Sequence, residues 1–95
     1  MSTIIIPTQL PPAVKDWNSN HVEQFFIVNQ KEYSVEDSTI KKIKENDVGG
    51  RALFRTDRQQ FQNFGISYGQ AVNVIEVVDI IKRTKECVYI QTHVF

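Results

Sequence analysis

Four side chains could take part in nucleophilic chemistry, namely Ser19, His21, Cys87 and His93. Ser19 lies close to His21 in the chain and Cys87 close to His93, so each pair supplies a hydroxyl or thiol and a base. Catalysis by such a pair also needs a group that orients the base and donors for an oxyanion, and the sequence suggests neither. We therefore expect a cap position for Ser19, a tail thiol for Cys87, and no enzymatic activity.

The sequence also lacks the patterns of common metal and phosphate sites. With two His and one Cys there is no Cys-x-x-Cys or paired-His spacing for zinc. Gly49-Gly50 lacks the Gly-x-x-x-x-Gly-Lys frame of a phosphate-binding loop, and we interpret it as a helix terminator. We expect no cofactor, no metal and no small-molecule substrate.

Length and composition indicate one small globular domain. The chain has 95 residues, of which 41% are hydrophobic and 23% are charged, with a formal net charge of zero. No long-range field therefore draws the whole molecule to nucleic acid or to an anionic membrane. The apolar run Ile4-Ile5-Ile6, closed by Pro7, is too short for a signal peptide or a membrane helix. We expect an intracellular, cytoplasmic location, with the nucleus left open.

The pattern of apolar residues, prolines and glycines predicts an all-α fold. Residues 1–16 hold all three prolines and form a linker or N-terminal arm, 17–85 form the helical domain, and 86–95 form a C-terminal tail. We expect helices over 20–28, from about 35–38 to before Gly49, over 51–54, 57–64 and 70–85, with a polar link at 29–34. Asn18 or Ser19 is the expected N-cap of the first helix. Asp57 with Gln60 forms a capping box, and Gly65 ends that short helix.

The apolar face of each expected helix supplies the predicted core. We also expect Ala52 to point inward. The predicted core comprises Val22, Phe25, Phe26, Ile40, Ile43, Val48, Leu53, Phe54, Phe61, Phe64, Ile66, Val74, Ile75, Val78 and Ile81.

This order of elements resembles the sterile alpha motif (SAM) domain family. The resemblance rests on Trp17, the pair Phe25-Phe26, the turn at 48–50 followed by Leu53-Phe54, the element 61–66, and Gly69 opening the last helix. It covers residues 17–85. It implies a single five-helix bundle that acts as a non-enzymatic protein-interaction module in scaffolding or signalling. The implied partner is a protein, either another SAM-like domain or a second copy of the chain, which would give oligomerisation.

Three features depart from the family pattern. The segment between Phe26 and Val48 is longer than usual, Gly49 stands where the family often has Asp, and Gln70-Ala71 stand where many members have Arg or Lys. Six cations and three anions lie between Lys41 and Arg58, whereas residues 69–81 hold no cation. The middle of the domain is therefore positive and the opening of the last helix mildly negative, which reverses the usual polarity. A head-to-tail contact then remains possible with exchanged signs.

The expected partner-binding residues lie on these two surfaces. They are Arg51, Arg55 and Arg58 in the middle of the domain, and Gln70, Val72, Asn73 and Glu76 at the start of the last helix. Val77 and Ile80 fall outside the apolar stripe of that helix and form a second candidate surface. Either residues 4–10, Trp17 or the tail residues 88–90 cover them, or a partner does.

The alternative function is an RNA-binding module. It would use the basic residues Lys41, Lys42, Lys44 and Arg51, which are also consistent with an ordinary solvated helix face. Some members of the resembled family bind RNA through cations at the start of the last helix. This chain has Gln70, Ala71 and Asn73 there, so we expect protein binding rather than nucleic-acid binding.

Overall fold

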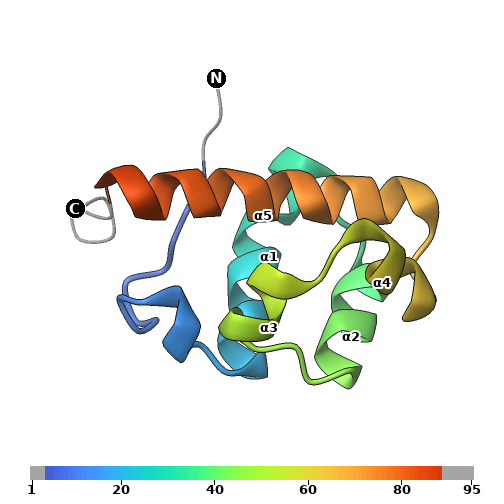
Figure 1. The fold of residues 1–95 in the computed structure, drawn as a ribbon, viewed down its shortest axis with the longest axis horizontal. Coiled ribbons are helices and arrows are strands. Elements are labelled where there is room, and N and C mark those ends of the chain that lie inside the picture. The colour runs from blue at the N-terminus through green and yellow to red at the C-terminus, as the bar shows by residue number, and fades with distance from the viewer. Residues whose placement is uncertain (1–3, 89–95) are drawn as a thin grey trace.

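The computed structural model describes residues 4–88, with side chains described through residue 83. Every regular element in that part of the chain is helical, as predicted (Figure 1). The described chain contains the 3-10 helix η1 (Val14–Asp16) and the helices α1 (Ser19–Tyr33), α2 (Asp37–Glu45), α3 (Gly50–Arg55), α4 (Arg58–Asn63) and α5 (Tyr68–Val88). The longest helix, α5, packs against α1, α3 and α4; in Figure 1, α3 and α4 lie below it and α1 crosses it.

Helix α1 begins as predicted but continues five residues past its expected end. The Asn18 side chain accepts a hydrogen bond from the His21 amide, and the His21 side chain accepts one from the Asn18 amide. The N-cap is therefore Asn18 rather than Ser19, which is the first residue of the helix. The polar link predicted at 29–34 is wrong up to Tyr33, because Asn29 and Tyr33 are buried on the inner face of the helix. The extra length between Phe26 and Val48 therefore lies in α1.

The prediction that Gly49-Gly50 ends the second helix is wrong, because these glycines stand at the start of α3. Helix α2 ends at Glu45, and Asp47 then adopts a left-handed conformation with φ 54°. The Gly50 amide donates to the Trp17 carbonyl at 2.9 Å, and a Cβ on Gly50 would lie 1.7 Å from the Val14 carbonyl oxygen. The glycine is needed because the main chains of η1 and α3 touch.

The capping box of α4 is present as predicted. Asp57 accepts from the Gln60 amide at 2.9 Å, and Gln60 accepts from the Asp57 amide at 3.0 Å. Gly65 ends this segment with φ 95°, a conformation that an L side chain rarely adopts. This turn directs the chain through Ile66, which is buried, into α5.

Helix α5 begins at Tyr68 rather than Gln70 and runs to Val88 rather than Lys85. Cys87 is therefore part of the helix, not of the expected tail. The remainder of that tail, residues 89–95, lies outside the described residues, as does His93.

Most of the predicted core is buried. Phe54, Phe64 and Ile75 are only half-buried, and Ala52 is exposed, so its predicted inward position is wrong. The core also contains buried hydrophobic residues that the prediction omitted, namely Leu10, Val14, Trp17, Tyr33, Val35, Ala71, Val77 and Ile80.

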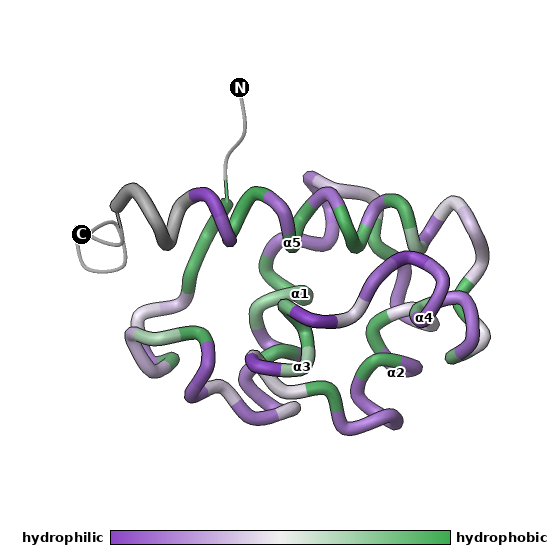
Figure 2. Tube along the Cα trace, viewed as in Figure 1, coloured by the Kyte–Doolittle hydropathy of each residue, from purple (hydrophilic) through white to green (hydrophobic). Residues whose placement is uncertain are grey.

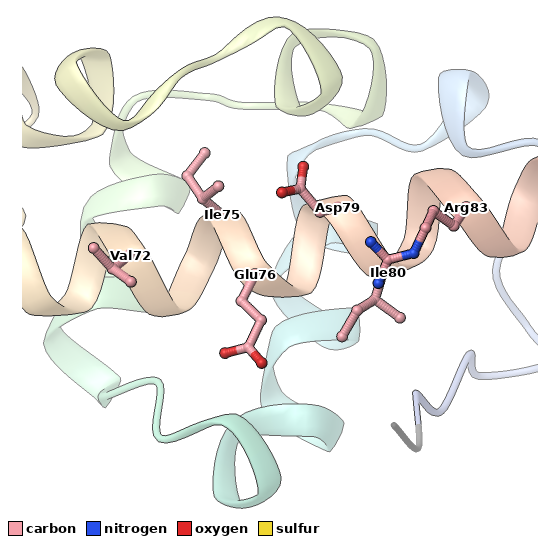
Figure 3. A pocket seen from close by; sticks show the side chains of 6 residues that line it. All are labelled: Val72, Ile75, Glu76, Asp79, Ile80 and Arg83. Carbon is pink, nitrogen blue, oxygen red and sulfur yellow. The ribbon is translucent and has the colours of Figure 1, made fainter. Parts of the chain in front are cut away.

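The N-terminal arm, defined here as residues 4–10, packs against this core. Leu10 is buried, and Ile4 and Ile6 pack against the core cluster. The arm runs beside the second half of α5 (Figures 1 and 3), and its hydrophobic stretch at residues 4–6 is green in Figure 2. The indole N–H of Trp17 donates to the Pro11 carbonyl at 2.8 Å and fastens the segment after the arm. The packed unit therefore includes part of residues 1–16, for which the sequence predicts either a linker or an N-terminal arm.

Val77 and Ile80 are buried within the chain. Val77 is fully buried and Ile80 is 8% exposed. The second candidate surface is thus not available to a partner in this structure, because folding already covers these two side chains.

Candidate interaction surfaces

The outward face of α5 carries the most distinctive surface of the described chain. A shallow hollow of about 350 Å³ is lined by Val72, Ile75, Glu76, Asp79, Ile80 and Arg83. In Figure 3, Ile75 and Asp79 point to one side of the helix and Glu76 and Ile80 to the other. Val72 is 39% exposed, and Glu76, Asp79 and Arg83 are exposed. The surface can offer apolar contact flanked by two carboxylates.

Glu76 and Asp79 are unpaired in this part of the structure. The ion pair found among the described side chains joins Lys44 to Glu23, on α2 and α1. Neither α5 carboxylate forms an ion pair with a described side chain, and the cation in the same hollow is Arg83, one turn after Asp79. Their negative potential is available to a positively charged partner.

Gln70 and Asn73, two of the predicted binding residues, use their side chains inside the molecule. The Gln70 oxygen Oε1 accepts from the Glu36 amide at 2.8 Å and from the Thr39 hydroxyl at 2.7 Å. The Nε2 of Gln70 and the Nδ2 of Asn73 donate to the Ser34 carbonyl, at 2.9 and 3.1 Å. Both amides hold the start of α5 against the link between α1 and α2.

The three predicted arginines divide into two groups. Arg51 and Arg55 are exposed, four positions apart on α3, so they share one side of that helix. Neither forms an ion pair with a described side chain. Arg58, at the start of α4, lies over the Tyr68 ring with 5.2 Å from its guanidinium carbon to the ring centroid.

Tyr68 is a surface residue that the sequence reasoning missed. Its side chain is 60% exposed although it is aromatic and opens α5. Tyr and Arg are enriched among the residues that contribute most to protein interfaces. The available signal was an aromatic residue outside every apolar stripe, directly before Gly69.

The basic residues of the RNA-binding alternative are partly engaged elsewhere. Lys44 pairs with Glu23 at 3.3 Å, and the methylene groups of Lys42 lie beside Gly65. Lys41 is exposed on α2, and Arg51 stands on a different helix. Of this set Lys44 is paired, and the other three cations are divided between α2 and α3.

The described region bears on two of the candidate sites, the Ser19 and His21 pair and a metal site. The Nδ1 atom of His21 accepts a hydrogen bond from the Asn18 amide at 3.0 Å, so its ring is part of the capping box of α1. No cluster of three or more His, Cys, Asp or Glu suited to a metal occurs among the described residues. Over the same residues, no helix combines the length and apolar character needed to span a membrane.

Comparison with known proteins supplies one match. A family model described as a SAM-like domain matches residues 1–80, which include the N-terminal arm, η1, α1 to α4 and more than half of α5. No match was found among curated proteins or among solved structures.

Proposed function

Because the chain belongs to the SAM-like domain family, we propose that it acts by binding a basic protein surface through the outward face of α5. SAM-like domains are in general non-enzymatic protein-interaction modules. The observation that carries the proposal is the pair of exposed, unpaired carboxylates, Glu76 and Asp79, beside the exposed apolar side chain of Val72.

The proposed partner is another SAM-like domain, and in the simplest case a second copy of this chain. Arg51 and Arg55 offer a basic surface on α3 that complements the two carboxylates on α5. Opposite potentials favour the encounter and fix the orientation of the two surfaces. Tyr68 adds an exposed aromatic side chain at the start of α5, and Arg58 on α4 adds a cation over its ring.

This pairing is heterologous, because the two copies contribute different surfaces. A heterologous contact leaves one free surface of each kind on every dimer, so assembly closes into a ring or continues as a filament. The polarity is the reverse of the common family arrangement, with the acidic surface on the last helix.

Molar mass measured by light scattering over a concentration series tests the proposal. Glu76→Lys should shift association to higher concentration, because it places a cation against the arginine surface of the next copy. Glu45→Lys is the matched control, since it makes the same charge change at an exposed position at the end of α2. Because it adds a cation to the already basic middle of the domain, it should not weaken association.

Two further measurements sharpen the test. Raising the salt from low to physiological strength should weaken association, because exposed charges are screened over roughly 8–10 Å. Mixing a Glu76→Lys copy with an Arg55→Glu copy should give a heterodimer, because the intact arginine surface of the first copy can still meet the intact carboxylates of the second. If neither the salt concentration nor the substitutions changed the concentration at which the chain associates, the proposal would be contradicted.

A further inference from the structure

Asn29 holds the main chain of the N-terminal arm in an unusual way for a helical domain. Its Oδ1 accepts from the Ile5 amide at 2.8 Å, and its Nδ2 donates to the Ile5 carbonyl at 2.8 Å. Nδ2 also donates to the Phe25 carbonyl of its own helix at 2.8 Å. Asn29 is 1% exposed, so its polar atoms cannot bond to water and these hydrogen bonds satisfy them instead. One buried amide therefore satisfies both main-chain groups of a single arm residue.

The side chains next to Ile5 show how the arm is recognised. Ile5 itself is 51% exposed, whereas Ile4 and Ile6 are partly buried and pack against the core. This alternation is that of an extended segment, which places successive side chains on opposite faces. The arm site, defined as Asn29 with the core surface under Ile4 and Ile6, thus recognises an extended main chain and two apolar side chains.

A short turn connects the arm to the rest of the fold. Thr8 and Gln9 are exposed, and the Leu10 amide donates to the Pro7 carbonyl at 3.2 Å across them. Opening this turn while Leu10 stays in its own core would leave residues 4–9 free to extend by roughly 20 Å, taking about 3.3 Å per residue.

We propose that the arm site also binds in trans, and that its occupant there is the arm of a second copy of this chain. A second copy presents the same main-chain groups at Ile5 and the same side chains at Ile4 and Ile6. Reciprocal exchange keeps every arm contact and changes only the Pro7-to-Leu10 turn, which makes it an inexpensive route to a dimer. This inference does not depend on the α5 face, because the arm and the two carboxylates are different contacts.

Deleting Thr8 and Gln9 from the full chain tests the inference. Without these residues the turn cannot form, so an arm can no longer fold back onto its own Asn29. If the arm site accepts an arm in trans, the deletion variant has twice the mass of one chain in light scattering at micromolar concentration. A variant that stays monomeric would overturn the proposal.

Substitutions at Ile5 then identify the contact in the deletion variant. Ile5→Pro removes the amide that Asn29 binds, while Ile5→Ala keeps the amide and alters only an exposed side chain. Ile5→Pro should raise the dimer dissociation constant about 100-fold, roughly tenfold at each of the two sites, whereas Ile5→Ala should change it little. If Ile5→Pro left the dimer dissociation constant unchanged, Asn29 would not be the residue that binds the arm.

The same sample separates this inference from the proposed function. An arm-exchanged dimer should persist in the Glu76→Lys background and at physiological salt, because its contacts are main-chain hydrogen bonds and apolar packing. A dimer lost under either condition would be held by the α5 carboxylates, and arm exchange would be wrong. Thermal melting of each variant checks that it remains folded.

Discussion

Gly50 and Val14 are in direct main-chain contact, since a Cβ on Gly50 would lie 1.7 Å from the Val14 carbonyl oxygen. Gly50 also donates its amide to Trp17 at 2.9 Å. These two contacts fix η1 against the first turn of α3. They make a glycine essential at a place where the sequence indicated only a helix stop.

Gly50→Ala should therefore destabilise the domain strongly. The added methyl group meets backbone rather than a movable side chain, so we expect a loss of at least about 3 kcal/mol. Gly69→Ala is the control, because nothing lies within 4 Å of its Cβ position, and it should raise stability by about 0.4–1 kcal/mol. Urea denaturation of both variants measures the difference, and equal effects would contradict the close contact.

Phe61→Ala should remove a large part of the stability. The Phe61 side chain is fully buried and packs edge-on against Phe64 with 5.8 Å between ring centroids. Truncating such a ring costs about 3–5 kcal/mol, compared with about 5–15 kcal/mol for a whole domain. Ile27→Ala, at a side chain that is 51% exposed, should change the free energy of unfolding by less than about 0.5 kcal/mol. An unchanged melting temperature for Phe61→Ala would contradict this packing.

Gln70→Ala should weaken the contact between the start of α5 and the segment that links α1 to α2. It removes the bonds to Glu36, Thr39 and Ser34, and because they are mostly exposed we expect a loss of about 1–2 kcal/mol. The Glu36 amide should also exchange its hydrogen faster. Gln59→Ala, which removes only a 3.3 Å contact to Asn63, is the control and should leave both quantities unchanged.

Titration with labelled RNA stem-loops should show no sequence-selective binding. Lys44 is paired with Glu23, which leaves Lys41 and Lys42 as the unpaired cations of α2, too few phosphate contacts for tight binding. At about 150 mM salt we expect only non-specific binding, with a Kd of roughly 10⁻⁴ to 10⁻⁶ M. A submicromolar affinity that changes with the loop sequence would instead favour the RNA-binding alternative.

Structural features that depend on residues a few positions apart could be predicted from the sequence. Asp57 and Gln60 satisfy each other across one helical turn, and Gly65 supplies the positive φ that ends the segment. The apolar stripes of α1, α2 and α5 also placed most of the core, because burial follows the helical period. These features need no knowledge of the remainder of the chain.

Features that depend on distant partners were not readable in this way. Asn29 looks like a loop residue until Ile5, far earlier in the chain, supplies its hydrogen-bonding partners. The same holds for Gln70, whose partners lie near Ser34, and for Val77, which the fold covers completely. Candidate binding residues chosen from charge and helix position therefore included side chains that the fold itself uses.

The position of α5 also sets the order in which the domain can be completed during synthesis. Its buried residues Val74, Val78 and Ile81 come near the end of the described chain, yet α5 packs against α1, which is made early. Until α5 leaves the ribosome, the part of α1 that it contacts lacks this cover. The nascent chain must therefore leave that part of α1 exposed while roughly fifty more residues are made, a time of roughly 3–10 s at 5–20 residues per second.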